Sequence, residues 1–267
     1  MPIGLQETRI DNIRQTTWGY IRKHYLMQAV GLSVLFIIGI PLFPLAFFVI
    51  ALGIMLYFYV RRKVRSEFIK QIGISMGFTY SSTAPPVGVG GKLFSLGHNP
   101  KLTDVLSGQY RSIPLRLLTY SYICGEGRNA CNYAFSVLEV TFQSSMPEIL
   151  LFSKINIAKM PPDIFSISKP LKLEGDFNNY FYLFVTKGYE METLELLTPD
   201  VMTNLIDIDK TSKSSLEFFG DKMYIYITKP INSKSDIQNI FSLADFFIDL
   251  FKHNASEIHV NPSPVQH

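Results

Sequence analysis

The sequence contains few cysteines and few histidines. Only Cys124 and Cys131 are cysteines among 267 residues, and no histidine lies near either of them in the sequence. A disulfide framework and a zinc site both need more of these side chains at short, regular spacings. We therefore predict no metal and no cofactor for this chain.

The histidines are also too scattered to indicate a catalytic centre. They lie near the termini or in expected loops, at His24, His98, His253, His259 and His267. No nucleophile, base and orienting acid can be assembled from this spacing. The sequence favours a binding or scaffold function over an enzymatic one.

Positive charge is scarce outside the N-terminal part. Residues 1–75 hold nine lysines and arginines against three acids, a net charge of +6, whereas the remaining residues have a net charge of −3, which gives the total of +3. Nucleic-acid-binding domains normally carry a basic face. We therefore predict no nucleic-acid partner.

Charge is absent altogether from Tyr25 to Val60, a run of about 36 residues. A single helix of this length would measure about 54 Å, against a bilayer core of roughly 30 Å. Pro41 and Pro44 lie in the middle of the run and disfavour a continuous helix. The pattern predicts a transmembrane hairpin with spans at 25–40 and 45–60.

A signal peptide and a soluble core both fit this run less well. A secretory signal peptide has a shorter apolar segment and a small-residue cleavage site, and here a second apolar segment follows at once. A buried hairpin in a soluble core would not need so long an uncharged run.

Basic residues flank the hairpin, whereas its tip carries none, so the positive-inside rule places both termini in the cytoplasm. The sequence thus predicts a multi-pass protein of the inner (plasma) membrane, with Trp18 as an interfacial anchor. The predicted anchoring residues are Trp18, Arg22, Lys23, Pro41, Pro44, Arg61, Arg62, Lys63 and Arg65.

Five segments follow from these patterns. They are an interfacial segment (1–24), the transmembrane hairpin (25–60), a membrane-exit helix and linker (61–92), a cytoplasmic α+β domain (93–254) and a disordered tail (255–267). Ser81 to Lys92 is rich in serine, proline and glycine, which is typical of a linker. Its Gly91-Lys92 pair does not make a phosphate-binding loop, because the spaced first glycine and the following Ser or Thr are missing.

Alternation of apolar and polar residues predicts a mainly antiparallel sheet after residue 103. The expected strands cover 104–110, 113–124, 131–143, 148–154 and 181–186, with a hairpin of 216–219 and 223–228. The loop 125–130 would place Cys124 and Cys131 opposite each other, within reach of a disulfide in an oxidising compartment but free in a reducing one.

Helical patterns occupy the C-terminal half. A helical turn is expected at 176–180, and a helix that starts at Glu192 is expected to break at Thr198-Pro199, where a cap precedes a first-turn proline. Ser233 to His253 is predicted to be an amphipathic helix that starts with a capping box and covers the sheet.

Several segments together resemble an uncharacterised family of bacterial membrane proteins, a domain of unknown function. The resemblance rests on GKLFSLGH, VLSGQYRSIPLRLLTYSY, LEVTF and LEGDFNNYFYLFVTKGYEMETLELLTPDVMTNLID, and it spans about residues 20–252. It implies an N-terminal transmembrane hairpin joined to a cytoplasmic α+β domain. It implies no catalytic residues.

The sequence therefore predicts a membrane protein, a two-helix transmembrane hairpin plus a soluble α+β domain with a C-terminal amphipathic helix. Its predicted function is a membrane-anchored binding or scaffold module, with the lipid bilayer and a protein partner or homo-oligomer as partners. The alternative is an enzyme acting on a membrane-associated substrate, with catalytic groups drawn from His98, Asp104, Glu126 and Arg128.

Overall fold

The computed structural model describes two compact units of the chain. Residues 1–77 with 232–237 belong to one unit, and residues 78–231 with 238–267 belong to the other. Within them, the structure describes residues 15, 17–23, 25, 30, 43–86, 88–159, 170–173 and 175–254.

The first unit is built around α2, Phe43–Ser75, which is one uninterrupted helix. Its start two residues before Leu45 places Pro44 in the first turn, where proline costs no intrahelical hydrogen bond. Residues 17–23 are also helical. The C-terminal half of α2 buries Phe68, Ile69 and Ile72, as their spacing predicts.

The predicted transmembrane hairpin is wrong. Among the described residues, no helix combines the length and the hydropathy that crossing a bilayer requires. The helix expected after residue 60 is confirmed, since α2 continues without a break through Arg61, Arg62, Lys63 and Arg65. The first expected span, 25–40, lies outside the described residues except for residues 25 and 30.

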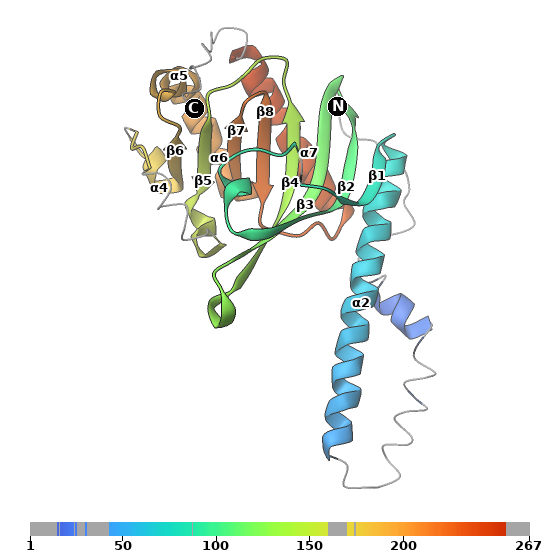
Figure 1. Cartoon of the computed structure of the whole chain (residues 1–267). Helices are drawn as coiled ribbons and strands as arrows, with labels where there is room; N and C mark the ends of the chain where they lie inside the picture. The colour runs from blue at the N-terminus through green and yellow to red at the C-terminus, as the bar shows by residue number, and fades with distance from the viewer. Residues whose placement is uncertain are drawn as a thin grey trace. The chain divides into compact units, whose positions relative to one another are not determined.

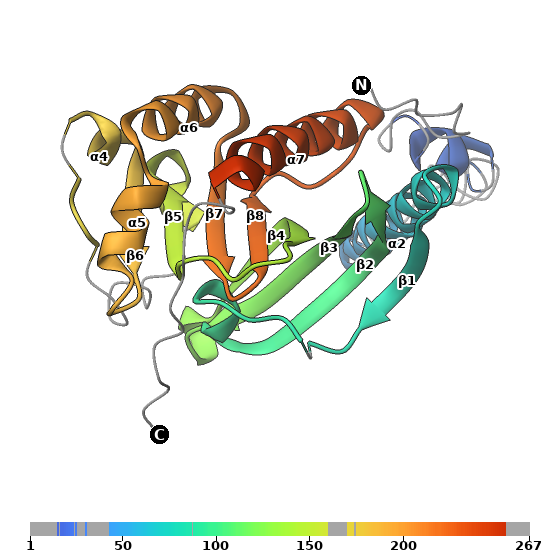
Figure 2. The ribbon, with the colours of Figure 1, turned by 90° about the horizontal axis from the view of Figure 1, so that it is seen from above.

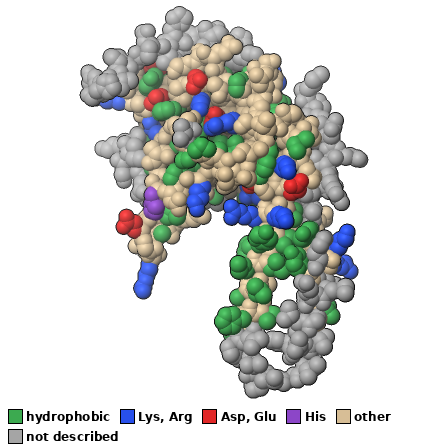
Figure 3. All heavy atoms as spheres, turned by 45° about the vertical axis from the view of Figure 1, so that its right-hand side comes forward, with side chains coloured by type: hydrophobic (Ala, Val, Ile, Leu, Met, Phe, Trp, Pro, Cys, Tyr) green, Lys and Arg blue, Asp and Glu red, His purple; other side chains and the backbone are tan. Residues whose placement is uncertain are grey.

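This correction extends to three other predictions. The membrane-protein fold class, the membrane-anchored function and the multi-pass inner-membrane location with cytoplasmic termini are wrong for the same reason. The bilayer as a partner stays a prediction. What the structure does contain is a row of exposed apolar side chains on the N-terminal half of α2, which Figure 3 shows next to Lys and Arg side chains.

The second unit is built on one antiparallel sheet with the order β1-β2-β3-β4-β8-β7-β5-β6. The strands are β1 (Thr79–Ala84), β2 (His98–Tyr110), β3 (Ile113–Cys124), β4 (Cys131–Thr141), β5 (Ile149–Ser153), β6 (Phe181–Val185), β7 (Ser214–Phe219) and β8 (Lys222–Ile227). The strands predicted from alternation are confirmed to within a few residues, apart from β2, which begins six residues earlier. β1 was not predicted, because it lies partly in the expected linker.

Helices α6 (Pro199–Ser212) and α7 (Lys234–Asn254) cover one face of this sheet, and α4 (Phe177–Tyr180) lies beside α6 on the same side (Figure 2). The short helix α5 (Glu190–Leu196) lies at the end of β6 (Figure 1). The ring of Phe251 lies 4.7 Å from that of Phe218 on β7, and the ring of Phe241 lies 5.1 Å from that of Tyr110 on β2. The prediction that the last helix packs on the sheet is confirmed.

The predicted capping-box-like start of α7 is confirmed in part. The backbone N–H of Asp236 donates to the Ser233 hydroxyl at 3.3 Å, which satisfies one otherwise unpaired donor of the first turn. The Asp236 carboxylate accepts from the backbone N–H of Asn232, the residue before the N-cap, at 2.9 Å.

Thr198 caps α6, as its position before Pro199 predicts, and its hydroxyl accepts a hydrogen bond from the backbone N–H of Val201 at 3.4 Å. We expect Thr198→Ala to lower the free energy of unfolding by about 1 kcal/mol, measured by urea denaturation. Thr203→Ala is the matched control, since Thr203 is exposed in the same helix and should change stability by less than about 0.5 kcal/mol. Equal losses in the two variants would contradict the capping role.

Candidate functional site

The sheet face away from the helices is crossed by residues 88–97, here called the crossing loop (Figures 1 and 2). The loop includes η1, Leu93–Ser95, and buries Leu93 and Leu96 against the sheet. The ring of Phe94 lies 4.6 Å from the ring of Tyr120 and 4.9 Å from that of Tyr224. An aromatic cluster thus attaches the loop to the centre of the sheet.

Below the loop, one rung of the sheet carries polar side chains across four strands. Arg116 on β3 pairs in register with Glu139 on β4, Glu139 pairs with Tyr224 on β8, and Tyr224 pairs with Glu217 on β7. Paired residues on neighbouring strands point to the same face. The rung therefore places two carboxyl groups under the crossing loop.

The Glu139 carboxylate forms ion pairs with two basic side chains. Its carboxylate lies 2.7 Å from the Arg116 guanidinium and 3.3 Å from the Lys222 ammonium, and only 4% of its side chain is exposed. The Lys222 ammonium also donates to the carbonyl oxygen of Gly88 at 2.6 Å. This charge cluster holds the start of the crossing loop.

Glu217 is 1% exposed and holds the centre of the loop. Its carboxyl group accepts hydrogen bonds from the backbone N–H groups of Lys92 and Leu93 and from the Tyr226 hydroxyl, the last at 2.7 Å. Burial raises the pKa of Glu217 from 4.5 to about 7, against the opposing effect of these hydrogen bonds and of the Lys92 charge. The group therefore changes its charge near neutral pH.

Two glycines let the loop approach these side chains. Gly91 has φ +111°, and a Cβ atom there would lie 2.8 Å from the Glu217 carboxyl group. A Cβ atom on Gly90 would overlap the ring of Phe219. The backbone N–H of Gly90 donates to the Tyr224 hydroxyl at 3.2 Å.

Beside this contact lies a hollow of about 390 Å³, which is within the usual size range of small-molecule sites. Its apolar side chains are Val89, Phe94 and Phe219, and its polar side chains are Lys92 and Ser95. Lys92 is half-buried, and its ammonium donates to the Thr186 hydroxyl at 2.6 Å. The hollow thus offers an apolar surface with one positive charge.

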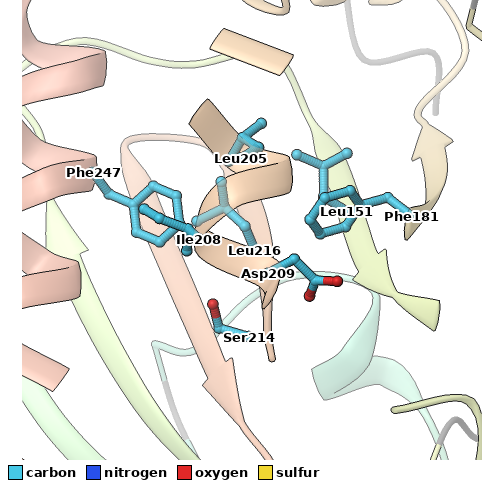
Figure 4. A pocket seen from close by; sticks show the side chains of 8 residues that line it. All are labelled: Leu151, Phe181, Leu205, Ile208, Asp209, Ser214, Leu216 and Phe247. Carbon is cyan, nitrogen blue, oxygen red and sulfur yellow. The ribbon is translucent and has the colours of Figure 1, made fainter. Parts of the chain in front are cut away.

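A second cavity, on the helix face, is too small for a ligand. It measures about 10 Å³, roughly the space of one water molecule. Figure 4 shows the Asp209 carboxyl group and the Ser214 hydroxyl among its apolar lining side chains. Asp209 is 4% exposed, and its burial raises the pKa of the carboxyl group, although Ser153 and the charge of Lys213 act in the opposite direction.

The catalytic candidates from the sequence do not all converge. His98, at the start of β2, pairs in register with Ile123 near the end of β3, so it lies at the same end of the sheet as the loop that carries Glu126 and Arg128, whereas Asp104 lies away from that end. Asp104 accepts a hydrogen bond from the Tyr80 hydroxyl at 3.1 Å, and it lies six residues along β2 from His98, roughly 20 Å away. Glu126 and Arg128 lie on the exposed loop between β3 and β4. Within the described residues, no three acidic, cysteine or histidine side chains are grouped to hold a metal ion.

The predicted anchoring residues lie in the first unit where the structure describes them. Arg22 and Lys23 are exposed on the helical segment 17–23, and the Trp18 ring lies 5.7 Å from the Tyr57 ring. Arg61, Arg62, Lys63 and Arg65 follow one another in α2, and Pro41 is outside the described residues. The anchoring role of these residues stays a prediction, as does a protein or homo-oligomeric partner.

Sequence reasoning missed Glu217 and the role of the crossing loop. A signal existed for Glu217, because it is a lone acid between apolar residues in an expected strand. A buried carboxyl group needs hydrogen-bonding partners. Two of these partners, the backbone N–H groups of Lys92 and Leu93, lie about 125 positions away in the sequence, at the end of a segment whose composition is typical of a linker.

Comparisons with known proteins give no family for this chain. Neither the protein-family models nor the curated proteins contain a match. A crystal structure of the mycobacterial trehalose monomycolate transport factor A, TtfA, is similar, with a TM-score of 0.48 and 11% identity over 70% of this chain and 94% of that one. At this level of similarity, no property of TtfA transfers to this chain.

Proposed function

We propose that the sheet domain is a binding module for a small ligand with an apolar body and one anionic group, held in the hollow beside the crossing loop. The hollow itself carries the proposal, because its size, its aromatic walls and the Lys92 ammonium match what small-molecule sites provide. Phe94 and Phe219 would contact the apolar body, and Lys92 would contact the anion.

Catalysis fits the same site less well. A carboxyl group with a pKa near 7 suits a general acid or base. Glu217, however, does not line the hollow, and its hydrogen bonds go to the backbone of the loop and to Tyr226. Its geometry fits a group that positions the loop.

The probe for this proposal is octanoate, with octan-1-ol as its neutral counterpart. We expect octanoate to bind with the higher affinity and Lys92→Met to weaken octanoate binding about threefold, since a half-exposed ion pair contributes up to about 1 kcal/mol. Octanol binding should not change in this variant. Isothermal titration calorimetry measures both affinities.

Thr186→Val is the matched control, because it removes the hydrogen bond of the Lys92 ammonium but keeps the charge. It should leave octanoate binding nearly unchanged. If octanoate does not bind, or if Lys92→Met leaves its affinity at the wild-type value, the proposed ligand class is wrong.

A further inference from the structure

We propose that Cys124 and Cys131 form an intramolecular disulfide by exchange with a low-molecular-weight disulfide such as glutathione disulfide. Neither cysteine is part of a disulfide in the structure. The site is at the end of the β3–β4 hairpin, and its chemistry does not depend on the proposed ligand site.

The hairpin register places the two cysteines directly opposite each other, as the last pair of the β3–β4 ladder. Opposite residues of antiparallel strands have Cα atoms about 4.5 or 5.5 Å apart, depending on the pair type. Both distances lie within the range of about 4.4–6.8 Å seen in disulfides. The backbone therefore needs little movement for the bond to form.

The two thiols differ in their exposure. Cys131 is exposed, whereas Cys124 is 6% exposed and belongs to the core cluster that includes Tyr120 and Tyr122. A soluble disulfide can therefore reach Cys131 but not Cys124. Cys124 is placed to react second, by attacking the Cys131 sulfur after Cys131 has formed a mixed disulfide.

The loop between the cysteines is exposed and turns back on its own backbone. Residues 125–130 are all exposed, and backbone hydrogen bonds join Asn129 N to Glu126 O at 3.1 Å and Ala130 N to Gly127 O at 3.4 Å. Arg128 lies within this exposed loop and offers a trypsin cleavage site between the cysteines. A disulfide would keep the two sides of such a cut together.

The exchange proceeds in two balanced steps. The Cys131 thiolate attacks one sulfur of glutathione disulfide, which forms a mixed disulfide and releases one glutathione thiolate. The Cys124 thiolate then attacks the Cys131 sulfur and releases the second glutathione. The protein loses two thiol protons and two electrons, and one glutathione disulfide becomes two glutathione molecules.

The test is to incubate the full chain with glutathione disulfide and to analyse it by mass spectrometry and by trypsin cleavage. We expect a monomer lighter by two hydrogen atoms, whose fragments after cleavage at Arg128 separate only after reduction. Cys124→Ser should instead retain one glutathionyl group. Cys131→Ser should react at least about tenfold more slowly, because its remaining thiol is buried.

Two results would overturn the proposal. One is wild-type protein that keeps a stable glutathionyl group on Cys131, as the Cys124→Ser variant does. The other is a disulfide that joins two chains through Cys131, seen as a dimer that reduction converts to monomer.

Discussion

Glu217→Gln is expected to remove most of the loss of stability that the wild-type protein shows between pH 5 and pH 8. The raised pKa, about 7 against an ordinary 4.5, means that the folded protein binds more protons than the unfolded chain between these values. Stability therefore falls as the pH rises through this window. Glutamine imitates the neutral carboxyl group and does not titrate.

The size of this effect follows from the shift in pKa. Each pKa unit corresponds to about 1.4 kcal/mol, so Glu217 costs the wild-type protein about 2–3 kcal/mol between pH 5 and pH 8. Urea denaturation of both proteins at the two pH values measures it. The contribution of Asp209, whose pKa is also raised, is present in both proteins and cancels in the comparison.

If the free energy of unfolding changed with pH by the same amount in the wild type and in Glu217→Gln, Glu217 would not titrate between pH 5 and pH 8. The charged and titratable groups around it are Lys92 from the crossing loop and Tyr224 and Tyr226 from β8. Burial raises the pKa of each tyrosine above the ordinary value of 10, so neither tyrosine changes its charge between pH 5 and pH 8.

Gly91→Ala is expected to lower the free energy of unfolding by about 3 kcal/mol. Part of this loss is the strain of a φ of +111° in a residue with a side chain, which costs about 1–3 kcal/mol. The rest comes from the new Cβ atom, which would lie 2.8 Å from the Glu217 carboxyl group and push the loop from the sheet. Urea denaturation measures the loss.

Gly88→Ala is the matched control in the same loop. Gly88 also has a positive φ, +78°, but a Cβ atom there would meet no other atom within 4 Å. Its substitution should cost only about 1 kcal/mol of backbone strain. If both alanine variants lost the same stability, the close approach of Gly91 to Glu217 would not contribute.

The sequence predicted local structure well because local patterns determine it. The alternation of apolar and polar residues predicted the long strands β3 and β4. The Thr198-Pro199 pair predicted the break between α5 and α6. The 3.6-residue period of α7 predicted its buried face. Each of these signals lies within a few residues of the structure that it specifies.

The site could not be predicted, because it depends on contacts between distant residues. Serine, proline and glycine between residues 81 and 92 are as common in a free linker as in a loop fixed to a sheet. In this protein the segment is fixed to the sheet because Glu217, Tyr224 and Lys222 form hydrogen bonds with its backbone, and these three residues lie on strands far along the chain. The continuation of the helix past residue 60 was predicted and is confirmed, because α2 runs on to Ser75. The hairpin prediction is wrong, because no described helix has the length and hydropathy needed to cross a bilayer.

The most direct test of the ligand site is to measure nuclear Overhauser effects between octanoate and the folded protein. We expect contacts from the octanoate chain to the ring protons of Phe94 and Phe219, which line the hollow. Contacts confined to the exposed side chains of α2, such as Phe47 and Phe48, would contradict the proposed site.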